Sequence, residues 1–235
     1  MTLSDKQILE CIKSGTVVIS PFEKKNLNTS SYDITLGEWF FREVPTKHNH
    51  PIYNPYKERH TKYIWGAPLR AEKAKDTLSA YNIDWSDYGI LPDDKIILIE
   101  PGETILAHTI EFIGGRVNIT TQMQARSSMG RNFIEICKCA GWGDVGYVNR
   151  WTMEITNNSR LYSIPLVVNR RVGQIVFYET GEILGKDYSV GGKYSLSDNL
   201  MKLKKAWKPE MMLPKMYLDR EAVEARKKMN DKKIK

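Results

Sequence analysis

The 235-residue chain has three cysteines, four histidines and no long apolar segment. Cys11, Cys137 and Cys139 are an odd set without the spacing of a disulfide framework, which indicates a reducing compartment. The apolar runs, such as Ile96 to Ile99, fall far below the roughly 18 residues that cross a bilayer. Residues 1–7 include an acid and no apolar stretch, which is not typical of a secretory signal. We therefore expect a cytoplasmic protein, cellular or virus-encoded, with no membrane partner.

Motifs for zinc chemistry and for common nucleotide folds are also missing. A zinc nucleoside deaminase needs H-x-E and a later P-C-x-x-C, whereas this chain has only Cys137 and Cys139 and no His followed two residues later by Glu. His48, His50 and His60 lack partners at metal-binding spacing, so we expect adventitious binding there at most. Neither G-x-S-x-G nor G-x-x-x-x-G-K-[ST] occurs, which excludes the usual nucleophile elbow and P-loop. We expect no zinc and no resident metal site.

Positive charge is concentrated near the C-terminus. The chain carries 35 Lys and Arg against 28 Asp and Glu, and residues 201–235 hold 12 and 5 of these, which leaves 23 of each sign elsewhere. A nucleic-acid groove normally clusters basic residues through the folded domain, so we expect no nucleic-acid partner. Residues 218–235 have the composition of a solvated, basic, polar tail.

Short β-rich segments separated by turn residues dominate the chain. Ser4 and Gln7 ahead of Ile8, with Gly15 behind, predict a capped helix first. The segments that predict strands are 16–20, 32–36, 95–100, 104–110, 116–123, 151–156, 164–168 and 172–178. Many short strands and few helices indicate a barrel or sandwich. We expect one β domain over 1–217, interrupted at 45–94 by an excursion that has one helix near 71–80 and no core of its own.

Two segments combine residue types that suit an anionic ligand. Residues 125–131 bring two arginines, two serines and a helix start together, which suits phosphate, although a serine cap with surface arginines fits that short string equally well. Residues 140–147 predict a hairpin whose three glycines bring the backbone close to a ligand. Glu154 lies in an otherwise apolar and β-branched strand. A lone acid there more often faces solvent, but pointing inward it would have a raised pKa and become a candidate proton shuttle.

Taken together, these segments resemble the dCTP deaminase branch of the trimeric dUTPase superfamily. The likeness runs through Leu3–Ile8, Ser31–Gly37, Ala125–Arg131, Ala140–Glu154, Arg171–Phe177 and Gly192–Tyr194. Glu154 follows Asp144 by ten residues, the family's spacing between its hairpin Asp and its catalytic Glu, where plain dUTPases usually have an apolar residue. The resemblance implies a mainly β, dUTPase-like distorted barrel, jelly-roll-like, with a short N-terminal helix, an inserted excursion and a C-terminal lid.

The resemblance also implies roles for individual residues. Glu154 would carry protons, Ser127 and the backbone of Ala140 would hold the water, Arg131 would support the electrostatics, and Asp144 would lie near the sugar. Substrate contacts would come from Arg126, Ser128, Trp142, Tyr147, Thr152, Met153, Gln174, Tyr188, Lys193 and Tyr194. The implied activity is metal-free deamination of dCTP at cytosine C4, in a homotrimer with sites between subunits. Gly141 and Trp142 resemble the bifunctional type, which continues to dUMP and pyrophosphate with Mg²⁺ carried by the triphosphate.

Three departures from the family pattern leave the substrate and the product open. Ala125 replaces the usual Gly before Arg126, Cys137 stands where a His is common, and Asn149 replaces a hairpin Gly, although Asn tolerates a positive φ. Ala125 narrows the pocket or alters base preference, so a modified cytosine remains a candidate substrate. The alternatives are a dUTPase without deaminase activity, a deaminase that releases dUTP, and a catalytically silent nucleotide-binding regulator.

Overall fold

Antiparallel strands make up most of the computed structural model, which describes residues 1–45, 52–195 and 197–233. The strands are β1 (Val17–Ser20), β2 (Leu27–Asn28), β3 (Ser31–Arg42), β4 (Leu69–Arg70), β5 (Glu72–Lys73), β6 (Lys95–Ile99), β7 (Thr104–Gly115), β8 (Ile119–Ala125), β9 (Ile134–Glu135), β10 (Trp142–Gly143), β11 (Val148–Asn157), β12 (Ile164–Val167) and β13 (Arg171–Glu179). The helices are α1 (Asp5–Ser14), α2 (Glu58–Trp65), α3 (Ala74–Thr77), α4 (Ser127–Arg131), α5 (Leu200–Ala206) and α6 (Arg220–Lys233). Single 3₁₀ turns are η1 (Lys24–Asn26), η2 (Tyr188–Val190), η3 (Pro209–Met212) and η4 (Met216–Leu218).

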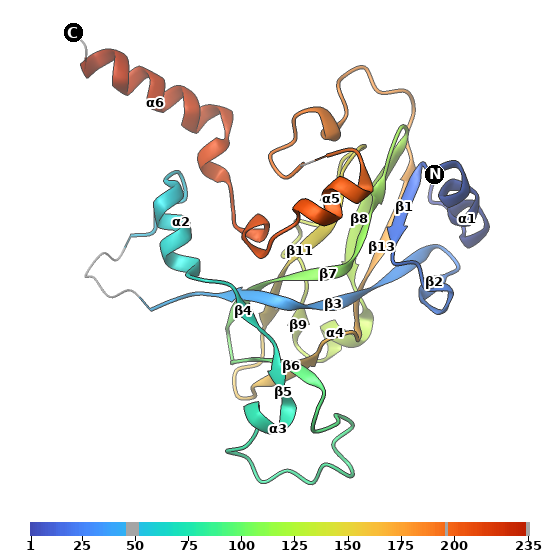
Figure 1. The fold of residues 1–235 in the computed structure, drawn as a ribbon, viewed down its shortest axis with the longest axis vertical. Coiled ribbons are helices and arrows are strands. Elements are labelled where there is room, and N and C mark those ends of the chain that lie inside the picture. The colour runs from blue at the N-terminus through green and yellow to red at the C-terminus, as the bar shows by residue number, and fades with distance from the viewer. Residues whose placement is uncertain (46–51, 196, 234–235) are drawn as a thin grey trace.

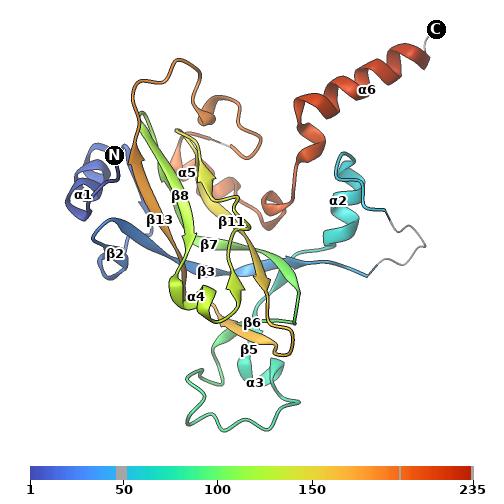
Figure 2. The ribbon, with the colours of Figure 1, turned by 180° about the vertical axis from the view of Figure 1, so that it is seen from behind.

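The main sheet curls around the core as half a barrel (Figures 1 and 2). Its strand order is β10-β8-β13-β3-β7-β11-β9, with β1, β2 and β4 attached beside this path. Tyr32, Ile34, Ile175 and Phe177 on neighbouring strands are fully buried and belong to one apolar cluster. Burying alternate β-branched and aromatic side chains on one face is the main source of stability for such a sheet. The mainly β prediction is confirmed.

The N-terminal helix forms as the sequence predicts. The Ser4 side chain accepts a hydrogen bond from the Gln7 backbone, and the Gln7 side chain accepts one from the Ser4 backbone. Gly15 ends α1 with a φ of 80°, a conformation that glycine adopts without a Cβ penalty. Ile8 is fully buried against the sheet, so α1 closes one side of the core.

The excursion has more structure than the sequence indicates. The helix expected near 71–80 is present but short, as α3 directly after strand β5, and α2 was not anticipated. The apolar residues of the excursion do not form a core alone but share one with strands outside residues 45–94. A second apolar cluster contains Ala74, Leu78, Ile90, Ile96 and Val167. It forms because β5, β6 and β12 make a separate three-stranded sheet, which gives the excursion a surface to bury against.

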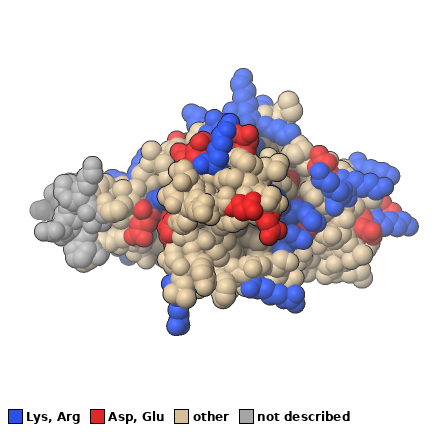
Figure 3. All heavy atoms as spheres, turned by 90° about the horizontal axis from the view of Figure 1, so that it is seen from below, with Lys and Arg blue, Asp and Glu red and all other residues tan. Residues whose placement is uncertain are grey.

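Charges on the excursion are paired rather than of one sign. Asp93 forms ion pairs with Lys73 and Lys75, at 3.0 and 2.9 Å, and Asp94 pairs with Arg170 at 3.4 Å. The face seen from below in Figure 3 accordingly shows Lys and Arg interspersed with Asp and Glu. Exposed pairs of this kind add little to stability. They also leave no broad basic surface on the face in view.

The C-terminal segment packs against the barrel before it projects away. Trp207, Met212 and Leu213 join apolar clusters with side chains of β3 and β7, including Phe41 and Leu106. Beyond them α6 extends away from the body on the side of α2 (Figures 1 and 2). In the described part of the chain, no helix is long and apolar enough to cross a membrane.

Candidate active site

A cavity of about 630 Å³ lies where β11, the preceding hairpin and the C-terminal segment meet. Glu154 and Asp144 are the acids in its wall, and Lys138 is its only cation among the described residues. The lining residues are Trp65, Thr104, Leu106, Lys138, Ala140, Trp142, Asp144, Tyr147, Trp151, Thr152, Glu154, Tyr188, Tyr194, Met212 and Pro214. Eight of the residues that the sequence singles out therefore lie around one cavity.

Strand β11 presents Glu154 to the cavity by simple alternation. Met153 and Ile155 are fully buried in the core, while Thr152 and Glu154 point to the opposite face. The side chain of Met153, expected to bind substrate, thus faces the core instead. The Oε2 atom of Glu154 is buried and has no hydrogen-bond partner among the described residues. Burial raises the pKa of Glu154 to about 7, so this carboxyl can take up or release a proton near neutral pH.

The glycines of the hairpin serve close packing more than ligand approach. A Cβ on Gly141 would lie 2.4 Å from the carbonyl oxygen of Met123, and one on Gly143 would overlap the ring of Trp151. These close contacts let β10 pair with β8, with Trp142 opposite Gln122. The glycines therefore fix the cavity wall.

Gly146 lets the C-terminal segment dock on the hairpin. Its φ of 90° suits glycine, and a Cβ there would lie 2.8 Å from the carboxyl carbon of Asp187. The backbone of Tyr188 then donates a hydrogen bond to the carbonyl of Val145 at 2.8 Å. The Tyr188 ring meets the ring of Tyr147 edge-on, with centroids 5.2 Å apart. Residues distant in sequence, Tyr147 and Tyr188, thus become neighbours in the wall of the cavity.

A tight turn places Lys138 and Ala140 at the cavity. The backbone of Ala140 donates to the carbonyl of Cys137 at 2.6 Å. Lys138 and Cys139 have φ values of 41° and 62°, a left-handed conformation that costs a non-glycine residue about 1–2 kcal/mol. Strain of this size at a cavity wall is typical of functional segments.

Tyr194 reaches the cavity because Asn149 holds its backbone. The Asn149 side chain donates to the carbonyl of Tyr194 at 3.1 Å and accepts from the backbone of Arg150 at 2.9 Å. Asn149 does not have the positive φ considered from the sequence. Its amide holds the C-terminal segment on the cavity instead. Tyr188 adds to this by accepting a hydrogen bond from the Tyr194 backbone at 3.3 Å.

The arginine segment forms a second cluster. Asp33 is 3% exposed and lies 2.9 Å from a guanidinium nitrogen of Arg171 and 3.6 Å from one of Arg126. Ser127, Ser128 and Arg131 follow on α4 and are exposed. Gln174 lies opposite Asp33 on the paired strands β13 and β3, so it belongs to this cluster. Arg126 and Arg171 also line a separate cavity of about 680 Å³.

One chain does not bring the two clusters together. Trp142 of the first cavity pairs with Gln122 on β8. Arg126 lies four residues after Gln122, which at strand spacing is a separation of roughly 13 Å. None of Arg126, Ser127, Ser128, Arg131 and Gln174 lines the cavity that holds Glu154. Lys193 does not line it either, although its neighbour Tyr194 does.

Sequence reasoning missed several residues of the two clusters. Asp33 carries the same signal as Glu154, a lone acid in a β-branched strand, and could have been found that way. Trp65 comes from the excursion, and its buried indole N–H has no partner among the described residues. Leu106 and Met212 also line the cavity but look like ordinary core residues in the sequence. Only the three-dimensional arrangement reveals them.

Metal ligands are not gathered in the described part of the chain. No group of three or more His, Cys, Asp or Glu side chains is placed there to hold an ion. His48 and His50 lie outside the described residues, so the expectation about them stays a prediction. The same holds for the expected absence of zinc.

The curled antiparallel sheet and its ionisable carboxyl define a β protein with an acid-base site. Residues 2–180 match the family model described as dCTP deaminase-like. This chain belongs to that family.

Relatives of known function and a solved structure agree with this assignment. The chain is 32% identical over 215 residues to "dCTP deaminase, dUMP-forming" of Methanococcus aeolicus, which covers 86% of this chain and 98% of the relative. A protein of the same name from Hydrogenobaculum sp. is 32% identical over 185 residues, 78% of this chain and 85% of the relative. The crystal structure of 2′-deoxycytidine 5′-triphosphate deaminase from Agrobacterium tumefaciens matches with a TM-score of 0.50 at 15% identity, over 75% of this chain and 47% of that one. The expected fold family is confirmed.

Proposed function

We propose that the protein converts dCTP to dUMP, first by hydrolytic deamination at cytosine C4 and then by hydrolysis of the triphosphate. Family membership and the shared name of the relatives support this reaction. The observation that carries it is the Glu154 carboxyl, which faces the cavity. Burial raises the pKa of Glu154 to about 7, and one of its oxygens has no hydrogen-bond partner among the described residues. That state suits a group that first accepts a proton and then delivers it.

In the deamination step, Glu154 as carboxylate takes a proton from the attacking water. The oxygen adds to C4, and Glu154 delivers the proton to N3. Glu154 then moves the proton of the new C4 hydroxyl to the exocyclic nitrogen. The C4–N bond breaks, ammonia leaves and the C4 carbonyl forms, so that dCTP and water give dUTP and ammonia. The backbone of Ala140 and the hydroxyl of Ser127 orient the water, and Arg131 stabilises the charge of the addition. Trp142, Tyr147 and Thr152 hold the nucleotide against the cavity wall.

In the second step, dUTP and another water give dUMP and pyrophosphate. Asp144 orients this water toward the α-phosphate, at the other end of the nucleotide from Glu154. Mg²⁺ enters with the triphosphate as part of the substrate and offsets the charge on its oxygens. Arg126, Ser128, Gln174 and Lys193 are the proposed phosphate contacts.

The separation of the two clusters favours a homotrimer with sites between subunits. Ser127 and Arg131 must reach the water near Glu154, yet α4 is roughly 13 Å further along β8 than the hairpin of its own chain. A neighbouring subunit can bring its exposed α4 to this cavity, and a closed ring of identical subunits repeats that contact. We place the enzyme in the cytoplasm of a cell or an infected host.

Product analysis tests the reaction. Purified protein is incubated with dCTP and Mg²⁺, and dCTP, dUTP, dUMP and ammonia are resolved over time. Ammonia with dUMP and little dUTP supports the full proposal. Accumulating dUTP identifies a deaminase that stops early, turnover of dUTP alone identifies a dUTPase, and no turnover of either nucleotide favours a silent nucleotide binder.

Mixed subunits test the arrangement. Light scattering gives the subunit number, and Glu154→Gln chains are then co-assembled with Arg131→Met chains. If sites form between subunits, about a quarter of the sites in a random equal mixture regain both native residues. A site within one chain regains none, and the mixture stays as inactive as its parents.

A further inference from the structure

We propose that residues 207–219, outside the family-matched range 2–180, are an intramolecular strap that holds Lys193 and Tyr194 over the cavity before the nucleotide binds. Lys215 and Asp219 are its positioning residues. The proposal rests on the proposed function only in assigning the held segment to substrate binding.

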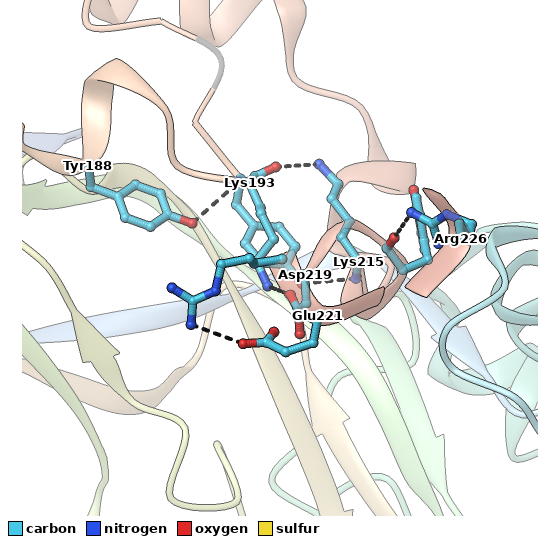
Figure 4. Close-up of polar contacts among 9 residues, drawn as sticks. Tyr188, Lys193, Lys215, Asp219, Glu221 and Arg226 are labelled. Carbon is cyan, nitrogen blue, oxygen red and sulfur yellow. Dashed lines mark hydrogen bonds and ion pairs between the residues drawn. The ribbon is translucent and has the colours of Figure 1, made fainter. Parts of the chain in front are cut away.

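The strap contacts the backbone and the side chains of Lys193 and Tyr194, the two lid residues (Figure 4). The Lys193 ammonium group forms an ion pair with the Asp219 carboxylate, which raises the pKa of Lys193. The Lys215 ammonium group donates to the carbonyl of Lys193 at 3.0 Å and lies 5.0 Å from the Tyr194 ring centroid. The Lys215 backbone donates to the Tyr194 hydroxyl at 3.0 Å. Two residues of the strap, Lys215 and Asp219, thus make all of these contacts with Lys193 and Tyr194.

Aromatic and apolar contacts anchor the strap to the barrel. Trp207 lies against His108, with ring centroids 4.7 Å apart, and the Arg150 guanidinium lies 4.6 Å from the Trp207 ring centroid. Met212 and Leu213 are 4% and 7% exposed and pack with Phe41. Buried anchors of this size bind the strap to the barrel wall. Met212 and Pro214 also line the cavity itself.

Holding the lid in place affects nucleotide affinity. Asn149 and Tyr188 hold the Tyr194 backbone, but Lys193 follows two glycines, Gly191 and Gly192, so without a strap the side chains of Lys193 and Tyr194 would sample many conformations. A site that is formed only part of the time binds its ligand more weakly in proportion to that fraction. The strap keeps the formed fraction high. A triphosphate then replaces Asp219 as the partner of Lys193 without moving the backbone.

Two strap variants and one matched control test this. Asp219→Asn removes the ion pair with Lys193, and Lys215→Met removes the ammonium group while keeping the backbone contact to Tyr194. Glu221→Gln is the control, because this variant removes the same charge two residues away. In the described part of the chain, Glu221 pairs only with the exposed Arg220. Two quantities are measured on full-length protein: the rate of trypsin cleavage after Lys193 without nucleotide, followed by mass spectrometry, and the kcat and KM for dCTP.

We expect Asp219→Asn and Lys215→Met to raise cleavage after Lys193 at least fivefold over the control. We also expect KM to rise about three- to tenfold while kcat stays within twofold. Cleavage and KM equal to those of Glu221→Gln overturn the proposal, and so does raised cleavage with unchanged KM. A lower KM for Asp219→Asn overturns it too, because Asp219 would then compete with phosphate.

Two further controls keep failures distinguishable. If Asp219→Asn unfolds, as judged by thermal melting, Lys215→Met decides alone. If the protein turns over no cytosine nucleotide, the proposed function fails, and calorimetric affinity for dCTP replaces KM beside the cleavage measurement. The strap is then judged by the same two criteria.

Discussion

Glu154 on β11 lies directly opposite Leu106 on β7 in the antiparallel register. A carboxyl beside an aliphatic side chain, with water held away from one oxygen, is an environment that disfavours the charged form. The raised pKa of Glu154 therefore follows from the strand pairing itself, and it is the property from which the mechanism begins.

Glu154→Gln should abolish deamination while leaving binding intact. The amide has nearly the same shape but cannot carry a proton, so we expect ammonia release to fall about 10³-fold or more. Ammonia release and dCTP affinity are measured on one preparation. Activity within tenfold of the wild type would remove Glu154 from the mechanism.

The pH dependence of kcat/KM should report the same group. Glu154 must be ionised to accept the proton of the water, and burial raises its pKa to about 7. Below that pH we expect the rate of deamination to fall roughly tenfold per pH unit. Stopped assays from pH 5 to 9 give the profile. A rate that stays constant down to pH 5 would show that ionisation of this carboxyl does not limit turnover.

The raised pKa of Glu154 should also make the free energy of unfolding depend on pH. The folded-state pKa of Glu154 is raised from 4.5 to about 7, so its proton stabilises the folded state at low pH, and this contribution is lost as the pH rises through 7. We expect Glu154→Gln to gain stability relative to the wild type at pH 8 but not at pH 4.5, by roughly 1–3 kcal/mol. Denaturant unfolding at both pH values measures this. An equal difference between the two proteins at both values contradicts it.

Local features of this protein were predicted well from the sequence, whereas packing between residues far apart in the chain was predicted poorly. The capping box at Ser4 depends on neighbouring residues, and so do most of the strands, which is why pattern reasoning found them. The second apolar cluster was missed because Ala74 and Leu78 of the excursion pack with Val167, which lies far along the chain. The same dependence on contacts between distant residues explains why the site was predicted only in part. The strand pattern left Glu154 facing either solvent or the interior, and the resemblance to the family supplied its expected role. Asn149 was given a turn role, whereas its side chain contacts the Tyr194 carbonyl.

Asp144→Asn should separate the two proposed reactions. Asp144 is exposed on the hairpin and lines the same cavity as Glu154. Because we propose that Asp144 orients only the second water, its amide variant should retain deamination and accumulate dUTP. We expect dUMP formation to fall about 10²-fold, with a much smaller change in dCTP affinity. A time course that resolves dCTP, dUTP and dUMP is the measurement. Equal loss of both activities would contradict separate roles for the two acids.

Asp33→Asn should weaken nucleotide binding from a position that touches no reacting atom. Asp33 is buried, accepts from Arg171 at 2.9 Å and from the Asn28 side chain at 2.9 Å, and lies beside Arg126. An amide cannot neutralise two guanidinium groups, so Arg126 should lose its fixed position as a phosphate contact. Because the side chains of Arg171 and Arg126 are 44% and 30% exposed, solvent screens much of the lost ion pairing, and we expect a loss of about 1 kcal/mol in unfolding free energy.

Glu23→Gln serves as the control, because Glu23 lines the cavity of about 680 Å³ with Arg126 and Arg171 but forms no ion pair with either arginine among the described residues. We expect the Kd for dCTP to rise at least tenfold in Asp33→Asn and to stay within twofold in the control. The pH at which kcat/KM falls should be the same in both, since Glu154 lies in the other cluster. A shift of that pH in Asp33→Asn would mean that the two clusters are coupled more closely than the phosphate contacts require.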